Sequence, residues 1–283
     1  MKVIRSIGII GAGQMGSGIA QTAAVSGYQV TLYDSFSGVA DKAAERICAN
    51  LEKLVSKGRL DRTVCDAAVK SITVVDSLEA TAKANLVIEA AVEDVLLKKK
   101  IFAALDKYAA PDTILASNTS SISLTEIASA TGRADQVIGM HFFNPAPVMK
   151  LLEVVKGYST SQDTIDTALA VGAKMNKVTI LAQDKAGFIV NRILDPMLNE
   201  AIFLLEEGVG TAEDIDNGMK FGCNHPMGPL SLADLIGLDV LLAVMEVLYR
   251  EYGDSKYRPA PLLKKMVRAG KLGKKTGQGF FQY

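Results

Sequence analysis

A short run of glycines near the start of the chain could hold a phosphate group. Gly11-Ala12-Gly13-Gln14-Met15-Gly16 follows an apolar segment and precedes alanine and isoleucine residues at helical spacing. Glycines in this pattern allow a tight turn, a close approach of the backbone to a pyrophosphate and close packing of helix on strand. The N–H groups and the dipole at the start of that helix would hold the phosphates. The pattern therefore predicts a dinucleotide site at Gly11, Gly13, Gln14, Met15 and Gly16.

Asp34 indicates which dinucleotide this site would take. It ends the second β-like segment and follows Gly16 by 18 residues. A carboxylate roughly 20 residues after the glycines binds the adenosine ribose in sites of this kind. Because a carboxylate there would repel a 2′-phosphate, we expect NAD(H) to be favoured over NADP(H).

Histidine and glutamate supply the second candidate chemistry. The chain has two histidines, His141 and His225. Histidine is the side chain best suited to handle a proton near neutral pH, so hydride transfer beside it needs no metal. Glu153 lies 12 residues after His141 among apolar neighbours, and a buried glutamate needs a partner. The prolines at 145 and 147 restrict the intervening loop, so the strand of Glu153 can return beside the histidine. The two residues are a candidate acid–base dyad, whereas His225 is expected to lie in a loop.

Composition and charge argue against several other classes of protein. The 31 basic residues equal the 31 acidic ones, which does not favour binding to nucleic acid. The longest apolar stretches, such as Val240–Met245, are far shorter than the ~18 residues that span a bilayer. Cys48, Cys65 and Cys223 are scattered, so neither a metal site nor a disulfide framework is expected. With no signal-like segment at the start, we expect a cytoplasmic protein without a membrane partner.

The elements that must position these residues alternate through residues 1–184. Strand-like segments are expected at 5–10, 29–34, 72–75, 86–89, 113–116, 137–140, 151–155 and 178–182. Helical patterns follow the glycine run and occupy 38–57, 62–70, 94–108 and 161–175, of which the 38–57 and 62–70 patterns form a helical insertion. This alternation predicts an α/β domain of the Rossmann type, with a doubly wound parallel sheet.

The remaining residues, 185–283, have little β character. Helical segments are expected at 187–207, 211–221, 230–237, 238–252 and 259–269, punctuated by glycine and proline. Asn191, Asp195 and Asn199 recur at i, i+4 spacing and share one polar face, and Pro196 falls inside that helix. The pattern predicts a C-terminal all-α domain. Its apolar excess, as in Val240–Met245 and Leu262–Leu263, predicts a homodimer formed through this domain.

Several longer motifs resemble those of a known family. Residues 116–121 read ASNTSS, residues 139–154 read GMHFFNPAPVMKLLEV, residues 187–192 read GFIVNR and residues 273–281 read GKKTGQGFF. With these motifs the whole chain resembles the short-chain L-3-hydroxyacyl-CoA dehydrogenases, most closely the bacterial 3-hydroxybutyryl-CoA dehydrogenases of butyrate-type fatty acid metabolism. HFFNP followed by that glutamate is specific, and the chain departs from the pattern at none of the key positions.

The resemblance implies a reaction and a set of roles. The reaction would interconvert (S)-3-hydroxyacyl-CoA and 3-oxoacyl-CoA, with NAD⁺ and NADH as the cofactor pair. His141 would be the general base and Glu153 the carboxylate that orients it. Ser120 and Asn191 would hydrogen-bond the reacting oxygen of the acyl-CoA substrate.

The same resemblance implies contacts to the cofactor and to CoA. Glu93, Lys98, Ser120 and Asn144 fall where the family contacts the nicotinamide side of the cofactor, and Lys275 of the C-terminal tail falls there too. Lys57 falls where the family binds the CoA phosphates, and Lys53 lies one helical turn before it.

Three alternatives remain open. A 3-hydroxyisobutyrate or 6-phosphogluconate type dehydrogenase would share the architecture but would use a catalytic lysine in the helical domain, where this chain has Asn191. A gulonate-type sugar-acid dehydrogenase would share the histidine motif. A non-catalytic NAD-binding structural protein would need neither His141 nor Glu153. Oxidation of NADH by acetoacetyl-CoA would separate these alternatives from the expected enzyme.

Overall fold

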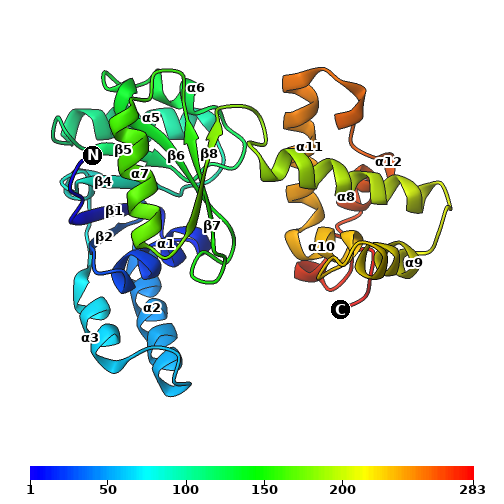
Figure 1. Ribbon diagram of the computed structural model, residues 1–283, viewed down its shortest axis with the longest axis horizontal. Coiled ribbons are helices and arrows are strands. Elements are labelled where there is room, and N and C mark those ends of the chain that lie inside the picture. The colour runs from blue at the N-terminus through cyan, green and yellow to red at the C-terminus, as the bar shows by residue number, and fades with distance from the viewer. The chain divides into compact units, whose positions relative to one another are not determined.

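The computed structural model describes residues 1–283. The chain divides into two compact units, Met1–Lys185 and Ala186–Tyr283, whose helices and strands are labelled in Figure 1. None of the helices combines the length and the apolar character that crossing a membrane requires.

The first unit is built on one sheet of eight strands in the order β3-β2-β1-β4-β5-β6-β7-β8. All neighbouring strands run parallel except β6 and β7. The strands are β1 (Ser6–Ile10), β2 (Gln29–Tyr33), β3 (Ile72–Val74), β4 (Leu86–Glu89), β5 (Ile114–Ser117), β6 (Val137–Phe142), β7 (Leu151–Lys156) and β8 (Val178–Gln183). The order of the first six strands gives the doubly wound α/β fold that the alternation predicted.

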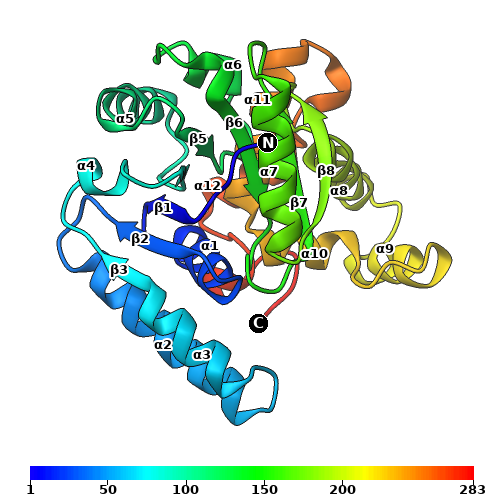
Figure 2. The ribbon, with the colours of Figure 1, turned by 60° about the vertical axis from the view of Figure 1, so that its left-hand side comes forward.

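Helices connect the parallel strands of this unit. They are α1 (Gln14–Val25), α2 (Val39–Ser56), α3 (Arg62–Ser71), α4 (Leu78–Thr81), α5 (Val95–Tyr108), α6 (Leu124–Ala128), the short 3₁₀ turn η1 (Ala134–Gln136) and α7 (Gln162–Lys174). Figure 2 shows α2 and α3 side by side as a pair that projects beyond β3, which is the expected helical insertion. Helix α7 packs across β6, β7 and β8.

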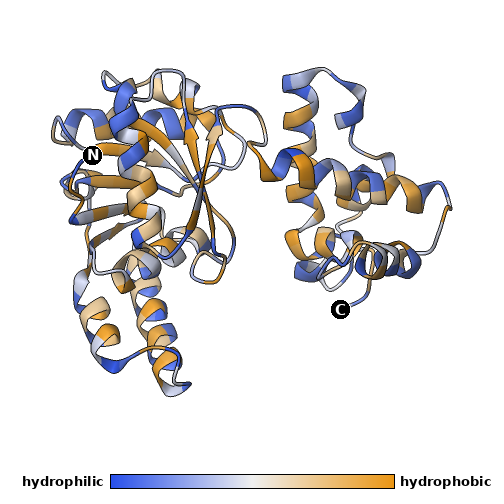
Figure 3. Cartoon of the chain, viewed as in Figure 1, coloured by the Kyte–Doolittle hydropathy of each residue, from blue (hydrophilic) through white to orange (hydrophobic).

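The sheet forms the core of the first unit because its central strands are apolar on both faces. Strands β4, β5 and β6 are buried along their whole length, as expected for strands covered by helices on both sides. Figure 3 shows the hydrophobic colour concentrated on these strands, with the hydrophilic colour on the outer faces of the surrounding helices. The carboxyl ends of β1, β4, β5 and β6 therefore present their polar residues at one rigid edge.

The pairing of β6 with β7 differs from the expected all-parallel sheet. Only the eight residues 143–150 join these strands, and a parallel crossover needs a dozen or more. The strands therefore pair antiparallel. The short helices α4 and α6 were also missed, because four or five residues are too few for a helical period to be recognised.

The second unit is entirely helical. It contains α8 (Val190–Glu206), α9 (Ala212–Asn217), α10 (Pro229–Ile236), α11 (Leu238–Tyr252) and α12 (Pro261–Arg268), with the short turns η2 (Gly218–Gly222), η3 (Ser255–Tyr257) and η4 (Lys274–Thr276). The expected helix at 211–221 thus ends at Asn217 and continues as the π-helical turn η2. A separate apolar core joins α8, α10, α11 and α12.

Two buried carboxylates organise this unit internally. Asp216 accepts hydrogen bonds from the backbone N–H groups of Leu230 and Ser231, at 2.8 and 3.0 Å, and so caps the start of α10. Asp234 accepts from the backbone N–H groups of Phe280 and Phe281, both at 3.0 Å. The C-terminal segment is thereby fixed to α10.

A third buried carboxylate in this unit, Asp195, lacks such partners. Its neighbour on the polar face of α8, Asn199, bonds the backbone of Arg258 and Ala260. Asp195 is only 4% exposed, and its Oδ2 atom has no hydrogen-bond partner. Burial raises the pKa of Asp195 to about 7, because a carboxylate is costly to ionise away from water.

This geometry predicts a stability that depends on pH. In the unfolded chain Asp195 ionises near its ordinary pKa of 3.8, whereas the folded protein holds the proton up to about pH 7. The stabilisation is complete below the unfolded pKa and is lost as the pH rises through the folded one, at up to about 1.4 kcal/mol per pH unit. In the Asp195→Asn variant this loss is absent, so its melting temperature should exceed that of the wild type by several degrees at pH 8 and by much less at pH 5. The measurement is calorimetry over that range.

Glu200 provides the matched control, since it is an exposed acid on the same helix. Glu200→Gln should show no comparable change with pH. A stability difference for Asp195→Asn that is the same at every pH would contradict the assignment.

Candidate active site

The glycine run forms a turn between β1 and α1 that only glycine can build. Gly11 has a φ of +89°, and a Cβ there would lie 2.6 Å from the carbonyl oxygen of Ala90. A Cβ on Gly16 would lie 1.7 Å from the carbonyl oxygen of Gly11. At Gly13, which caps the start of α1, a Cβ would meet nothing within 4 Å. Two glycines thus serve packing, and Gly13 leaves the start of α1 open to a phosphate.

Asp34 lies against this turn, directly after β2. Its Oδ2 accepts a hydrogen bond from the backbone N–H of Ala12 at 2.7 Å, and its Oδ1 accepts from the N–H of Phe36 at 3.0 Å. The carboxylate is therefore held next to the phosphate-binding turn. The sequence spacing placed Asp34 in this region without indicating these bonds.

A pocket of about 550 Å³ adjoins the same turn. Its lining includes Gly13 and Gln14 of the turn, Lys42 and Arg46 of α2, and Pro147 of the loop after β6. Nη2 of Arg46 lies 3.5 Å from the carbonyl oxygen of Ala12. The pocket therefore has a size and a positive charge that suit part of a phosphorylated ligand.

Sequence reasoning did not identify Lys42 and Arg46. The available signal was their helical spacing along α2, which continues through Asn50, Lys53 and Lys57. Lys53 and Lys57 are exposed at the end of this helix. These side chains give one face of α2 a row of positive charges.

His141 and Glu153 lie directly opposite each other on β6 and β7. His141 Nδ1 and Glu153 Oε2 are 2.7 Å apart. Glu153 is completely buried and His141 is 6% exposed. The rings of His141 and Phe143 pack with their centroids 4.5 Å apart. The strand pairing therefore fixes the imidazole against the carboxylate.

This contact sets the tautomer of the imidazole. An ionised carboxylate can only accept hydrogen bonds, so Nδ1 of His141 carries the proton that it donates to Glu153. In the neutral ring Nε2 is then the basic nitrogen. The pair can consequently take up a proton at Nε2 while Glu153 stabilises the resulting positive charge.

The loops around the dyad are tied down by polar side chains. Asn118, after β5, accepts a hydrogen bond from the backbone N–H of Phe142 at 2.9 Å. Gln14 donates to Oδ1 of Asn144 at 2.9 Å and thereby joins the glycine turn to the loop after β6. Asn144 was expected at the cofactor side of the site, whereas the bond from Gln14 was not anticipated.

Lys177 holds the loop between β6 and β7 in a way that the sequence did not reveal. Its ammonium donates hydrogen bonds to the carbonyl oxygens of Ala146 and Met149 at 2.6 and 2.8 Å. Burial lowers the pKa of Lys177. No spacing rule links a lysine before β8 to a loop about 30 residues earlier, so only the fold shows this contact.

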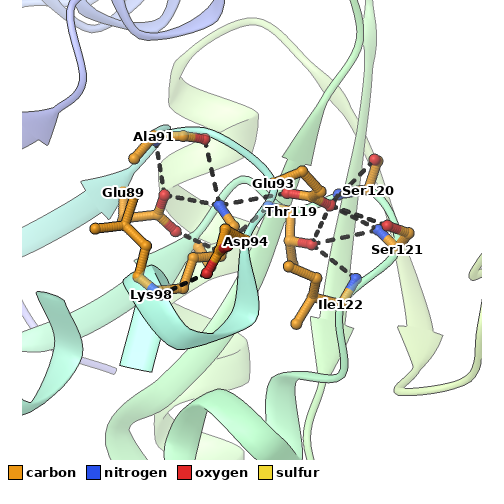
Figure 4. A network of polar contacts seen from close by, with 11 residues as sticks. Glu89, Ala91, Glu93, Asp94, Lys98, Thr119, Ser120, Ser121 and Ile122 are labelled. Atoms are coloured by element: carbon orange, nitrogen blue, oxygen red, sulfur yellow. Dashed lines mark hydrogen bonds and ion pairs between the residues drawn. The ribbon is translucent and has the colours of Figure 1, made fainter. Parts of the chain in front are cut away.

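Glu93 organises the turn that contains Ser120, as Figure 4 shows. Its Oε1 accepts hydrogen bonds from Thr119 Oγ1 at 2.6 Å and from the backbone N–H groups of Ser120 and Ser121 at 2.9 and 3.1 Å. Burial raises the pKa of Glu93, but Lys98 and these hydrogen bonds outweigh that effect, and the pKa is lowered overall. An ionised Glu93 is therefore part of the built site.

Lys98 lies inside the protein. Its side chain is 1% exposed, and its ammonium lies 2.7 Å from Oε1 of Glu89 and 3.4 Å from Oε2 of Glu93. Sequence reasoning placed Lys98 at the cofactor, but the ammonium is directed at two carboxylates and can influence a ligand through Glu93. Glu89 was missed, although a glutamate ending a fully apolar strand is a recognisable signal for a buried partner.

The second unit carries two further expected residues. Asn191 lies in the first turn of α8 and is half-buried. Lys275 lies in η4, and its ammonium is 2.5 and 2.7 Å from the two carboxylate oxygens of Asp239. Lys275 is therefore paired within its own unit.

Comparison with known proteins is consistent over the whole chain. The family model described as 3-hydroxyacyl-CoA dehydrogenase, NAD binding domain, matches residues 6–185. The model described as 3-hydroxyacyl-CoA dehydrogenase, C-terminal domain, matches residues 187–283. The match to an NAD binding domain covers the glycine turn and Asp34, and the cofactor is NAD(H).

Individual relatives are similar over almost their full length. The 3-hydroxybutyryl-CoA dehydrogenase of Clostridioides difficile is 50% identical over 277 residues, covering 98% of this chain and 99% of the relative. The human mitochondrial hydroxyacyl-coenzyme A dehydrogenase is 41% identical over 288 residues, covering 99% and 92%. The crystal structure of (S)-3-hydroxybutyryl-CoA dehydrogenase from Ralstonia eutropha superposes with a TM-score of 0.96 at 48% identity, covering 99% of each chain. On these matches the chain belongs to the 3-hydroxyacyl-CoA dehydrogenase family.

Proposed function

We propose that this protein interconverts (S)-3-hydroxybutyryl-CoA and acetoacetyl-CoA with NAD(H). The observation that carries the proposal is the buried pair of His141 and Glu153, at 2.7 Å, in the unit that matches an NAD binding domain. The names of relatives at about 50% identity support the four-carbon substrate.

The dyad handles the proton of the reaction. NAD⁺ supplies the hydride acceptor at the carbon that bears the hydroxyl group. As that hydride leaves, Nε2 of His141 removes the hydroxyl proton, and the carbon–oxygen bond becomes a carbonyl. Glu153 keeps Nδ1 protonated and balances the charge of the imidazolium. In the reverse direction the imidazolium returns the proton to the oxygen.

Ser120 and Asn191 are proposed to position the reacting oxygen. The hydroxyl of Ser120 lies 3.3 Å from Oε1 of Glu93, a long hydrogen bond that a shorter one to a substrate oxygen can replace. The backbone of Ser120 stays fixed by the same carboxylate, at 2.9 Å. Asn191 has an amide that can donate to the same kind of oxygen. The family motif supports this role for both residues.

The cofactor is proposed to bind along the edge of the sheet. The glycine turn with Gln14 and Met15 would hold its phosphates, and Asp34 would hold the adenosine ribose. Glu93 and Asn144 would lie at the nicotinamide side, supported by Lys98 through Glu93. Lys275 is proposed as a further contact, which would require its pair with Asp239 to open.

Binding of the CoA part is proposed for the basic face of α2. Lys53 and Lys57 would meet the phosphates of CoA as flexible point charges. Lys42 and Arg46 extend the same face toward the pocket beside the glycine turn. This arrangement supports an acyl-CoA rather than a free acid as the substrate.

An assay with acetoacetyl-CoA tests the proposed activity. The protein should oxidise NADH when acetoacetyl-CoA is added, and should do so poorly with free acetoacetate or with NADPH. Asp34→Ala should weaken NADH binding and narrow the gap to NADPH, because the charge that repels a 2′-phosphate is gone. Activity on a sugar acid such as gulonate without activity on acetoacetyl-CoA would contradict the proposal.

The dyad predicts a specific pattern of losses. His141→Gln should lower kcat by about 10²–10⁴-fold, the usual contribution of general acid–base catalysis. Glu153→Gln keeps the shape but removes the charge, so kcat should also fall strongly. NADH binding, measured by fluorescence titration, should persist in both variants because the glycine turn is unchanged. Combining the two changes should add little further loss, since residues that act as a unit are not additive. Fully additive losses would show that the two residues act separately.

The second unit is proposed to form a homodimer. The sequence argument needs revision, because Leu241, Met245 and Leu263 are fully buried within the unit itself. The apolar side chains that remain exposed are others, including Ile193 at 69%, Leu235 at 52% and Val240 at 47%. They support a partner surface. Light scattering at micromolar concentration should give twice the 30.1 kDa chain mass, and Val240→Glu should favour the monomer. A wild-type protein with the mass of a single chain would contradict this.

A further inference from the structure

Glu89 is a buried carboxylate at the carboxyl end of β4 whose every partner belongs to the site region. Its Oε1 accepts hydrogen bonds from the ammonium of Lys98 and from the backbone N–H of Ala91, both at 2.7 Å. Its Oε2 accepts from the hydroxyl of Ser117 at 2.7 Å. Glu89 is completely buried, so it meets no ligand directly.

We propose that Glu89 is a positioning residue for catalysis, acting through Lys98 and Glu93 on the turn that presents Ser120. The inference rests on the proposed function, because it concerns the turn that would hold the reacting oxygen. It assigns Lys98 to the support of Glu93 rather than to direct contact with the cofactor.

The contacts form a chain of three charged side chains. Figure 4 shows the ammonium of Lys98 between the carboxylates of Glu89 and Glu93. Lys98 is closer to Glu89, at 2.7 Å, than to Glu93, at 3.4 Å. The other oxygen of Glu93 remains available to the turn, where it accepts from Thr119, Ser120 and Ser121.

Electrostatics explains why two carboxylates are needed. A buried ammonium must have a charged partner. If Glu89 were neutral, Glu93 would be the one remaining negative partner of Lys98 within this network. Lys98 would then draw Glu93 toward itself and away from the backbone N–H groups of residues 120 and 121. Glu89 thus leaves Glu93 free to hold the turn.

The first variant is Glu89→Gln, which keeps the shape and removes the charge. We expect kcat for acetoacetyl-CoA reduction to fall by about 10–100-fold, since a displacement near 1 Å at the reacting atoms can cost about 10²-fold. The KM for NADH should change less, because the glycine turn and Asp34 are untouched. The melting temperature will also fall, so this variant alone does not separate positioning from stability.

The double variant Glu89→Gln with Lys98→Met makes the separation. It removes both buried charges, so the melting temperature should return toward that of the wild type. Glu93 lacks its cation in this variant, and kcat should stay low. Recovery of both the melting temperature and kcat would overturn the proposal, because Glu89 would then serve only to neutralise Lys98.

The pH profile gives a second readout. In the reduction direction His141 acts as an acid, so its titration lowers kcat at high pH. Lys98 lowers the pKa of Glu93; without Lys98, Glu93 should protonate at a higher pH and the low-pH loss of kcat should move upward. A purely structural role would leave this limb in place.

Asp106→Asn is the matched control. Asp106 pairs with Arg133 at 2.6 Å in the same unit, and neither residue belongs to the site. This variant should lower the melting temperature and leave kcat unchanged. If the wild-type protein itself fails to reduce acetoacetyl-CoA, the proposed function fails. If the wild type is active and Glu89→Gln retains full kcat, only the present inference fails.

Discussion

The antiparallel pairing of β6 with β7 is the constraint on which the site depends. It sets His141 opposite Glu153, and a slip of one residue would turn both side chains to the other face of the sheet. Glu153 has no exposure to water, so its charge is tolerated because the imidazole meets it at 2.7 Å. The register is held from outside by Lys177, which bonds two carbonyl oxygens of the connecting loop. Strand pairing, loop and charge pair therefore define one another.

Much of this arrangement could be predicted from the sequence because it follows local rules. The glycine turn, Asp34 and the alternation of strands with helices are short-range patterns, and the structure shows the fold that they indicate. His141 and Glu153 could be suggested as partners because two prolines restrict the loop between them. The antiparallel direction of β7 follows from the length of that same loop.

Other features could not be predicted because they depend on contacts between distant segments. Lys177 and Glu89 are ordinary charged residues in the sequence, and only the packing of β8 on β7 and of α5 on the sheet region gives them their partners. Lys98 shows the reverse case. A motif identified the residue, but its burial decides that the ammonium bonds carboxylates of the protein. Motif position identifies important residues more reliably than it identifies what they touch.

Three buried carboxylates show how the partner determines what a charge can do. Glu153 meets an imidazole and can stabilise a proton that comes and goes. Glu89 meets a buried ammonium and two further donors, so its charge is committed to holding neighbouring side chains. Asp195, in the other unit, leaves one oxygen without a partner, and burial raises its pKa to about 7. The first arrangement suits catalysis and the second suits positioning. The third makes the second unit least stable where Asp195 ionises, so the response of stability to pH originates in a different unit from the acid–base pair.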